Sequence, residues 1–234
     1  MGELERTIAI VGAGRLGTAL AAALGTARPH GRGADARGAD VVLLCVPDAE
    51  IARAAAALAP GALVGHCSGA TGLCALVPHE AFSLHPLMTV APGASPGVFT
   101  GAGCAVAGST PRALAEATAL ADRLGMRPTT VTDEDRAAYH AAASMASNFL
   151  VTLQAAAERV AGTAGVKREL LAPLVRATVD NWASLGAIDA LTGPIVRGDS
   201  ETVERHRVAL GERTPDLLPL YDELARATRA LVAR

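Results

Sequence analysis

The feature that most constrains the fold is a glycine pattern close to the start of the chain. Gly12, Gly14 and Gly17 stand in the segment IAIVGAGRLGTAL, after a short apolar run and at the start of an alanine-rich helical pattern. In such a strand-to-helix turn, the first glycine permits the tight turn, the second leaves room for a pyrophosphate and the third lets the helix pack on the strand. The sequence therefore predicts a dinucleotide-binding βαβ unit, with phosphates at the helix N-terminus.

The choice of dinucleotide depends on residues about 20 positions further along. There the chain reads GTARPHGRGAD, in which Arg28, His30 and Arg32 precede the first acid, Asp35. Because basic groups suit a 2′-phosphate and an acid suits a ribose hydroxyl, we expect NADP rather than NAD. Arg15, inside the glycine turn, is a further candidate phosphate contact.

The rest of the chain indicates two domains. Up to residue 131, short apolar runs alternate with amphipathic stretches, which predicts a parallel sheet covered by helices. After residue 133 only helical periodicity is found. We therefore expect an α/β protein, with a Rossmann parallel sheet in a dinucleotide-binding domain (1–132) followed by an all-α domain for substrate and dimerisation (133–234). The expected strands are 7–11, 41–46, 63–66, 81–84, 104–107 and 129–131, and the expected helices of the first domain are 16–24, 49–58 and 111–124.

Composition restricts the class of function. The formal net charge is −2, with no basic excess, so neither nucleic acid nor an anionic membrane is an expected partner. The four cysteines form no CxxC pair, which gives no indication of a metal site or a disulfide framework. The first residues, MGELERTIAIVG, lack a targeting pattern, and we expect a cytoplasmic location.

One stretch, residues 137–157, has no charged side chain and is long enough to span a bilayer. It contains several polar residues, however, and His140, Ser144, Ser147 and Asn148 recur at the spacing of one helix face. We therefore expect a buried helix with a polar stripe rather than a membrane span.

Besides the glycine motif, five segments of the chain are informative: VVLLCVPD (41–48), HCSGATG (66–72), FSLHPL (82–87), YHAAASMASNFLVTL (139–153) and LTGPIVRGD (191–199). Together these segments resemble a family of short bacterial Rossmann-like oxidoreductases that have an all-helical C-terminal domain of unknown function. This family is similar to the 6-phosphogluconate-dehydrogenase-like superfamily, which includes β-hydroxyacid dehydrogenases, pyrroline-5-carboxylate reductases and ketopantoate reductases. The resemblance implies a nicotinamide-dependent reductase, usually dimeric, with substrate between the domains.

Ten residues are expected to contact the cofactor. They lie in the glycine turn, in the basic segment after the first helix and at the ends of the next two strands. The expected contacts are Gly12, Gly14, Arg15, Leu16, Gly17, Arg28, Arg32, Val46, Pro47 and Ser68.

The catalytic residues depart from the superfamily pattern. Asn148 matches the asparagine of a lysine–asparagine pair, but Ser144 stands where the lysine would be. One turn earlier, His140 can donate a proton to a carbonyl or imine as hydride arrives, with Ser144 and Asn148 holding the substrate; a satisfied core histidine is the alternative. His85, at a strand end, is expected to face the ligand crevice, although it could instead cap local carbonyls.

The turn LTGPIVRGD places Thr192 and Arg197 as candidate substrate contacts. The guanidinium of Arg197 suits a carboxylate, and pairing with Asp199 to stiffen the turn is the alternative. We expect an NADP-dependent reductase of a small carbonyl or imine, possible substrates including a 2-oxo acid such as ketopantoate. The alternatives are a deazaflavin-dependent NADP oxidoreductase and a non-catalytic NADP-binding sensor or scaffold.

Overall fold

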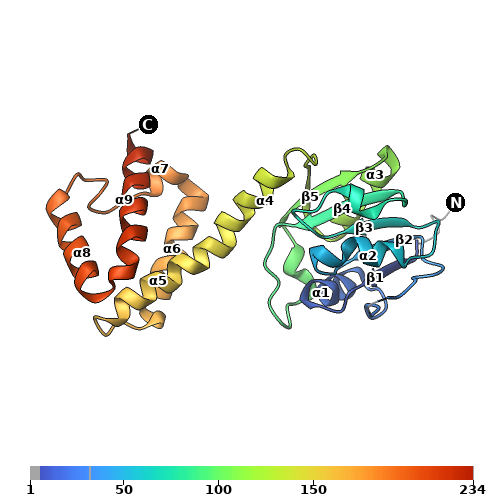
Figure 1. Ribbon diagram of the computed structural model, residues 1–234, viewed down its shortest axis with the longest axis horizontal. Coiled ribbons are helices and arrows are strands. Elements are labelled where there is room, and N and C mark those ends of the chain that lie inside the picture. Colours follow the sequence, from blue (N-terminus) through green and yellow to red (C-terminus); the bar gives the residue numbers. More distant parts are fainter. Residues whose placement is uncertain (1–5, 32, 234) are drawn as a thin grey trace. The chain divides into compact units, whose positions relative to one another are not determined.

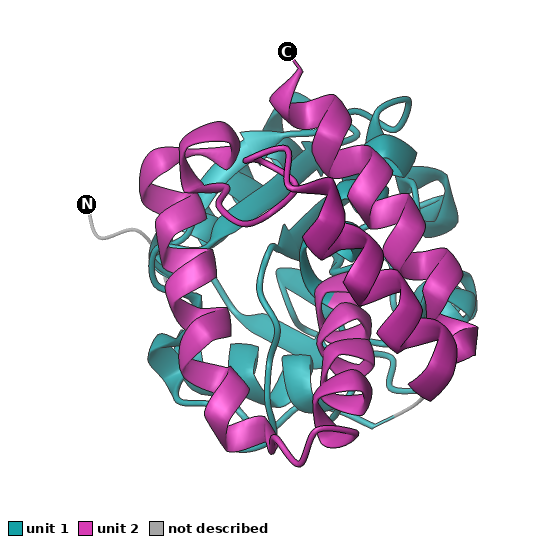
Figure 2. Cartoon of the chain, turned by 90° about the vertical axis from the view of Figure 1, so that its left-hand side faces the viewer, with its two compact units in different colours: residues 1–147 teal, residues 148–234 magenta. Residues whose placement is uncertain are grey.

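The computed structural model describes residues 6–31 and 33–233. The chain forms two compact units, residues 1–147 and residues 148–234, which Figure 2 shows in different colours. The expected boundary at residue 132 follows the last strand, which ends at Thr130, whereas the first compact unit continues to Ser147. The reason is that the first helix after the sheet carries a buried arginine, Arg136, whose contacts are with strand and loop residues of the first unit.

The first unit is built on a six-stranded sheet with the strands in chain order (Figure 1). The residue His30 forms an isolated parallel bridge with Val11 on the free side of β1, so β1 has a neighbour on both sides. The strands are β1 (Ile8–Val11), β2 (Val41–Leu44), β3 (Leu63–His66), β4 (Ala81–Pro86), β5 (Gly103–Gly108) and β6 (Arg127–Thr130).

Two apolar cores cover the two faces of this sheet, because side chains alternate along each strand. On one face, helices α1 (Arg15–Leu24) and α3 (Pro111–Arg123) pack on residues such as Leu43 and Phe82. On the other face, α2 (Ile51–Ala56) and the 3-10 turn η2 (Leu73–Leu76) pack on Val42 and Val64. The short 3-10 turns η1 (Asp48–Glu50) and η3 (Pro96–Phe99) complete this part.

The predicted Rossmann-like fold is confirmed, with one difference in strand direction. Strands β1 to β4 are parallel, but β5 runs antiparallel to β4, and Cys104 lies opposite Pro86. A parallel β5 would need a crossover connection that leads the chain back to the opposite end of the strands. The described link between β4 and β5 contains η3 as its only regular element and re-enters the sheet at the end where β4 finishes, so β5 is antiparallel to β4. The six predicted strands are all present.

The segment 137–157 is helical but not buried. It comprises α4 (Arg136–Ser144), the π-helical turn η4 (Met145–Phe149) and most of α5 (Leu150–Gly162). Arg136 is the one buried residue of the described α4, and α5 has none, so the expected buried helix is wrong. Among the described residues, no helix is long and apolar enough to cross a membrane.

The second unit is helical throughout its described residues. Its helices end where the sequence predicts breaks, at Gly162, ahead of the turn 191–198 and at Thr214. Asp199 caps α8, because its carboxylate accepts a hydrogen bond from the Thr202 amide at 3.0 Å. After α5 come α6 (Arg168–Leu185), α7 (Ala187–Ala190), α8 (Ser200–Arg213), η5 (Pro215–Leu217) and α9 (Leu218–Val232).

Candidate functional site

The three glycines of the motif have three different steric environments. Gly12 has a φ of +115°, and a Cβ there would lie 2.2 Å from the Cys45 carbonyl oxygen. A Cβ at Gly17 would lie 1.9 Å from the Gly12 carbonyl oxygen. At Gly14 a Cβ would meet nothing within 4 Å. Gly12 and Gly17 are therefore required by packing, whereas Gly14 faces open space.

The start of α1 is suited to an anion. Gly14 is the N-cap residue, so no side chain accepts a hydrogen bond from the first-turn amides, and the first turn holds no acid. Amides at a helix N-terminus attract negative charge. Arg15 is exposed in this turn, while Leu16 packs against the core.

The basic segment after α1 follows the edge of β1. The backbone of His30 pairs with that of β1, accepting from the Gly12 amide at 3.0 Å and donating to the Ile10 carbonyl at 2.7 Å. Arg28 is exposed close by in the sequence. Arg32 lies outside the described residues.

A small pocket of about 100 Å³ opens between the end of β1 and α2. Val46 and Pro47, both expected cofactor contacts, line it. Its remaining lining residues are Val11, Gly33, Glu50, Arg53, Ala54 and Ala57.

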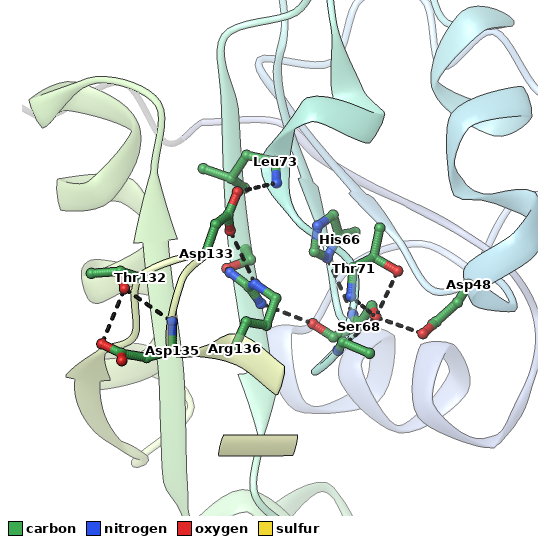
Figure 3. Close-up of polar contacts among 11 residues, drawn as sticks. Asp48, His66, Ser68, Thr71, Leu73, Thr132, Asp133, Asp135 and Arg136 are labelled. Atoms are coloured by element: carbon green, nitrogen blue, oxygen red, sulfur yellow. Dashed lines mark hydrogen bonds and ion pairs between the residues drawn. The ribbon is translucent and has the colours of Figure 1, made fainter. Parts of the chain in front are cut away.

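The loop after β3 is held by the hydroxyl of Ser68 (Figure 3). This hydroxyl donates to Asp48 Oδ2 at 2.8 Å and accepts from the amides of Ala70 and Thr71 at 3.1 and 2.9 Å. Ser68 is also buried. Its side chain therefore shapes the loop, and its expected contact with the cofactor stays a prediction.

Arg136, on α4, joins this loop to the sheet (Figure 3). Its guanidinium donates to Asp133 Oδ1 at 3.1 Å, to the Ser83 hydroxyl on β4 at 3.0 Å and to the Ser68 carbonyl at 3.4 Å. Asp133 Oδ2 in turn accepts from the Leu73 amide at 3.2 Å. Because Arg136 is only 2% exposed, these contacts fix the position of α4 on the first unit.

Two histidines meet over Gly69 of this loop. A Cβ at Gly69 would lie 2.9 Å from His85 Nε2 and 2.9 Å from His140 Cδ2, so any side chain there would displace one of the two imidazole rings. The His85 and His140 ring centroids are 6.3 Å apart. On the other side of His85, its Nδ1 lies 2.6 Å from the Tyr139 hydroxyl. His85 and His140 are thus brought together at the carboxyl end of β4.

The charge state of the histidines follows from burial. The pKa of His85 is lowered to about 4, mainly by burial and further by the nearby His140 and Arg136. The pKa of His66, at the end of β3, is also lowered by burial and by Arg136. His85 is therefore neutral at neutral pH.

The remaining expected site residues fall on both sides of the unit boundary. Ser144 ends α4 in the first unit, and Asn148 is the first residue of the second unit, inside the π turn. A π turn is wider than an α-helical turn, so it changes which residues share a face with His140. Thr192 and Arg197 are exposed in the loop before α8. Asn148, Thr192 and Arg197 all belong to the second unit. The roles of these three residues and of Ser144 stay predictions.

Two important residues were not singled out by the sequence. Arg136 sits in a charged stretch, TDEDR, that is typical of a solvated helix start, and only its burial reveals its role. Tyr139 is adjacent to His140, and the local pattern gives no sign that it pairs with His85, 54 residues away.

The fold resembles solved structures over almost the whole chain. A Bacteroides fragilis protein named as a candidate NADP oxidoreductase has a TM-score of 0.82 at 21% identity, covering 96% of this chain and 98% of that one. A Thermotoga maritima protein has a TM-score of 0.82 at 24% identity, with 97% and 98% covered. A reductive aminase from Aspergillus terreus, in complex with NADPH and ethyl-5-oxohexanoate, has a TM-score of 0.65 at 17% identity, with 96% and 94% covered. At these identities the likeness establishes a common fold.

The sequence itself matches one family model. No curated protein sequence matches the chain. The model described as domain of unknown function DUF2520 matches residues 102–228, which include β5, α4 and most of the second unit. Because this match covers more than half of the sequence, the chain belongs to the DUF2520 family.

Proposed function

We propose that this chain is an NADP-dependent oxidoreductase that reduces a small carbonyl or imine by hydride transfer. The observation that supports the proposal most is that His85 and His140 lie together next to Gly69. They lie at the carboxyl ends of the parallel strands, where the glycine turn after β1 also lies. Ligands of open α/β sheets bind at the carboxyl ends of the strands. Proton-transferring groups and a dinucleotide site at one edge suit hydride chemistry.

The first unit offers a fitting place for the cofactor. The uncapped amides of α1 and the open space at Gly14 suit the pyrophosphate, and the pocket beside Val46 and Pro47 suits the adenosine part. Arg28 is the described basic residue that we assign to the 2′-phosphate, together with Arg32. When bound, NADPH would supply the hydride.

We assign the proton transfer and the positioning of the substrate to residues of the chain. Neutral His85 donates a hydrogen bond to the carbonyl oxygen or imine nitrogen, and His140 gives the proton that this atom takes up as hydride reaches the carbon. Ser144 and Asn148 orient the substrate, and Thr192 and Arg197 contact its distal end, a carboxylate if the substrate is a 2-oxo acid. Ketopantoate is suggested as a substrate by the sequence resemblance to the superfamily that includes ketopantoate reductases.

The experiment measures nucleotide binding and then turnover. NADPH should bind more tightly than NADH in a fluorescence titration, and Arg28→Ala should reduce that preference. Arg112→Ala, which removes a surface arginine paired with Glu80 at 3.1 Å, is the matched control and should change nothing. Equal affinity for both nucleotides would exclude the NADP assignment.

Turnover is then assayed as NADPH oxidation with a panel of 2-oxo acids and cyclic imines. Reduction of any member supports the reductase. Tight NADPH binding without turnover of any member would favour the sensor alternative.

A further inference from the structure

Tyr139 and His85 form a hydrogen bond, and the surrounding groups determine which of the two side chains donates it. The phenol oxygen lies 2.6 Å from His85 Nδ1, and the two rings are edge-to-face with centroids 5.5 Å apart. Burial raises the pKa of Tyr139 to about 12, so the hydroxyl keeps its hydrogen at neutral pH. Among the described residues, no other acceptor for this hydrogen is found.

The neutral imidazole of His85 carries one N–H hydrogen, which is on either Nδ1 or Nε2. The charged and titratable groups that act on His85 are His140, Arg136, Asp48 and His66. Burial, His140, Arg136 and His66 all lower the pKa of His85 and keep the ring neutral, and Asp48 alone of these groups favours the charged form. A neutral imidazole has one N–H donor and one acceptor nitrogen. Because the phenol needs an acceptor, Nδ1 accepts and the ring hydrogen stands on Nε2.

The position of Nε2 makes this assignment relevant to function. In the described part of the chain, Nε2 of His85 has no hydrogen-bond partner, and it is not among the buried unsatisfied atoms. It lies over Gly69, where the absence of a side chain leaves it open beside His140. The free N–H therefore faces the place assigned to the substrate.

We propose that Tyr139 is a positioning residue that holds His85 as the neutral Nε2–H tautomer, so that the site presents a fixed, uncharged hydrogen-bond donor beside His140. The substrate role of this donor rests on the proposed function. A fixed N–H donor requires a lone pair on its partner. The site therefore selects a carbonyl or a neutral imine over a protonated iminium, whose nitrogen has no lone pair to offer.

The test reads the tautomer directly in the full-length protein without nucleotide or substrate. Long-range proton–nitrogen correlation spectra at pH 7 distinguish a protonated Nε2 from a protonated Nδ1, and His85→Gln identifies the His85 signals. We expect the Nε2–H form in the wild type. Protonation on Nδ1 would overturn the proposal, even if Tyr139→Phe does not fold.

A second variant tests the part played by the hydroxyl. Tyr139→Phe should replace the single His85 tautomer by a mixture, with an unchanged circular dichroism spectrum. Tyr221→Phe is the matched control, because Tyr221 makes the same kind of contact with His206, at 3.0 Å in the second unit, and its loss should not alter the His85 signals. An unchanged His85 spectrum in a folded Tyr139→Phe protein would refute the role of Tyr139.

Activity then separates this inference from the proposed function. Once a substrate is found, Tyr139→Phe should lower kcat about tenfold while NADPH affinity stays unchanged, since one positioned hydrogen bond to the reacting atom is weakened. A wild-type protein with the Nε2–H tautomer but no reductase activity would exclude the proposed function and leave the tautomer assignment standing. Full kcat in Tyr139→Phe would overturn the positioning role.

Discussion

At the scale of single residues, two glycines of the motif serve different purposes: Gly17 is required for packing, and Gly14 is expected to be required for nucleotide binding. Gly17→Ala places a methyl group against the Gly12 carbonyl and should destabilise the fold by about 1–3 kcal/mol, the usual cost of overpacking. Gly14→Ala meets no atom within 4 Å and should change stability by no more than about 0.5 kcal/mol. Gly14→Ala should nevertheless weaken NADPH binding, because its methyl group projects where the pyrophosphate is expected.

Urea denaturation and nucleotide titration of the two variants measure these effects. The same large loss of stability in both variants would contradict this division.

The neutral state of His85 makes stability depend on pH. Its pKa of about 4 in the folded protein lies below the ordinary value of 6.5, so between these pH values the unfolded chain binds more protons. The free energy of unfolding should therefore fall as the pH is lowered from 6.5 to 4. The contribution of His85 is at most about 3.5 kcal/mol, since one pKa unit corresponds to about 1.4 kcal/mol and the ring is partly exposed to solvent.

The measurement compares urea denaturation of the wild type with that of His85→Gln at pH 7 and at pH 4.5. The variant should lose less stability on acidification. An equal loss in both proteins would show that His85 is not held neutral by the fold.

His140 should matter for chemistry and not for nucleotide binding. If it donates the proton, His140→Ala should lower turnover by about 100-fold or more, the usual contribution of general acid catalysis, with NADPH affinity unchanged. Steady-state kinetics with a reduced substrate and a nucleotide titration give the two quantities. Full turnover would transfer the donor role to another group, such as a bound water.

At the scale of secondary-structure elements, the buried cation of Arg136 determines how α4 is held. The side chain of Arg136 is 3% exposed, while that of its partner Asp133 is 51% exposed. Asp133→Asn leaves the buried guanidinium without its counter-charge and should cost about 1–2 kcal/mol, reduced from the cost of a fully buried pair by the exposure of Asp133.

The matched control is Asp216→Asn. Asp216 pairs with Arg159 at 2.9 Å in the second unit, but both side chains are exposed, so little stability should be lost. Urea denaturation compares the two variants. Equal effects would mean that the burial of Arg136 adds nothing to the attachment of α4.

At the scale of the whole molecule, helix α6 of the second unit exposes several large apolar side chains. Helix α6 has no buried residue, and Leu170, Leu174, Trp182 and Leu185 on it are all exposed. Large exposed apolar patches mark association surfaces. We therefore expect a homodimer formed through the helical part of the chain, as also proposed from the sequence.

Light scattering at micromolar concentration should give twice the mass of the 23.6 kDa chain. Trp182→Arg should shift the protein towards monomer, whereas Val77→Arg, at an exposed apolar residue of the first unit, should not. A wild-type monomer would refute the dimer.

The sequence by itself determined the features that depend on local sterics and periodicity. The turn at Gly12 to Gly17, the six strands and the helix breaks at Gly162 and Thr214 all follow from residue conformations and side-chain spacing within a few positions. His85 and His140 were also found, because a strand end and a helix face are local properties.

The tertiary structure alone decided what depends on contacts between distant segments. The antiparallel β5 follows from the path of a link without a crossover helix, the burial of Arg136 from its contacts with Ser68 and Ser83, and the Tyr139–His85 pair from the position of α4 on β4. No local pattern contains this information, because Ser68 and Ser83 are 50 or more residues away from Arg136, and His85 is likewise 50 or more residues away from Tyr139. The free energy of these contacts is available only once the sheet has formed and α4 lies against it.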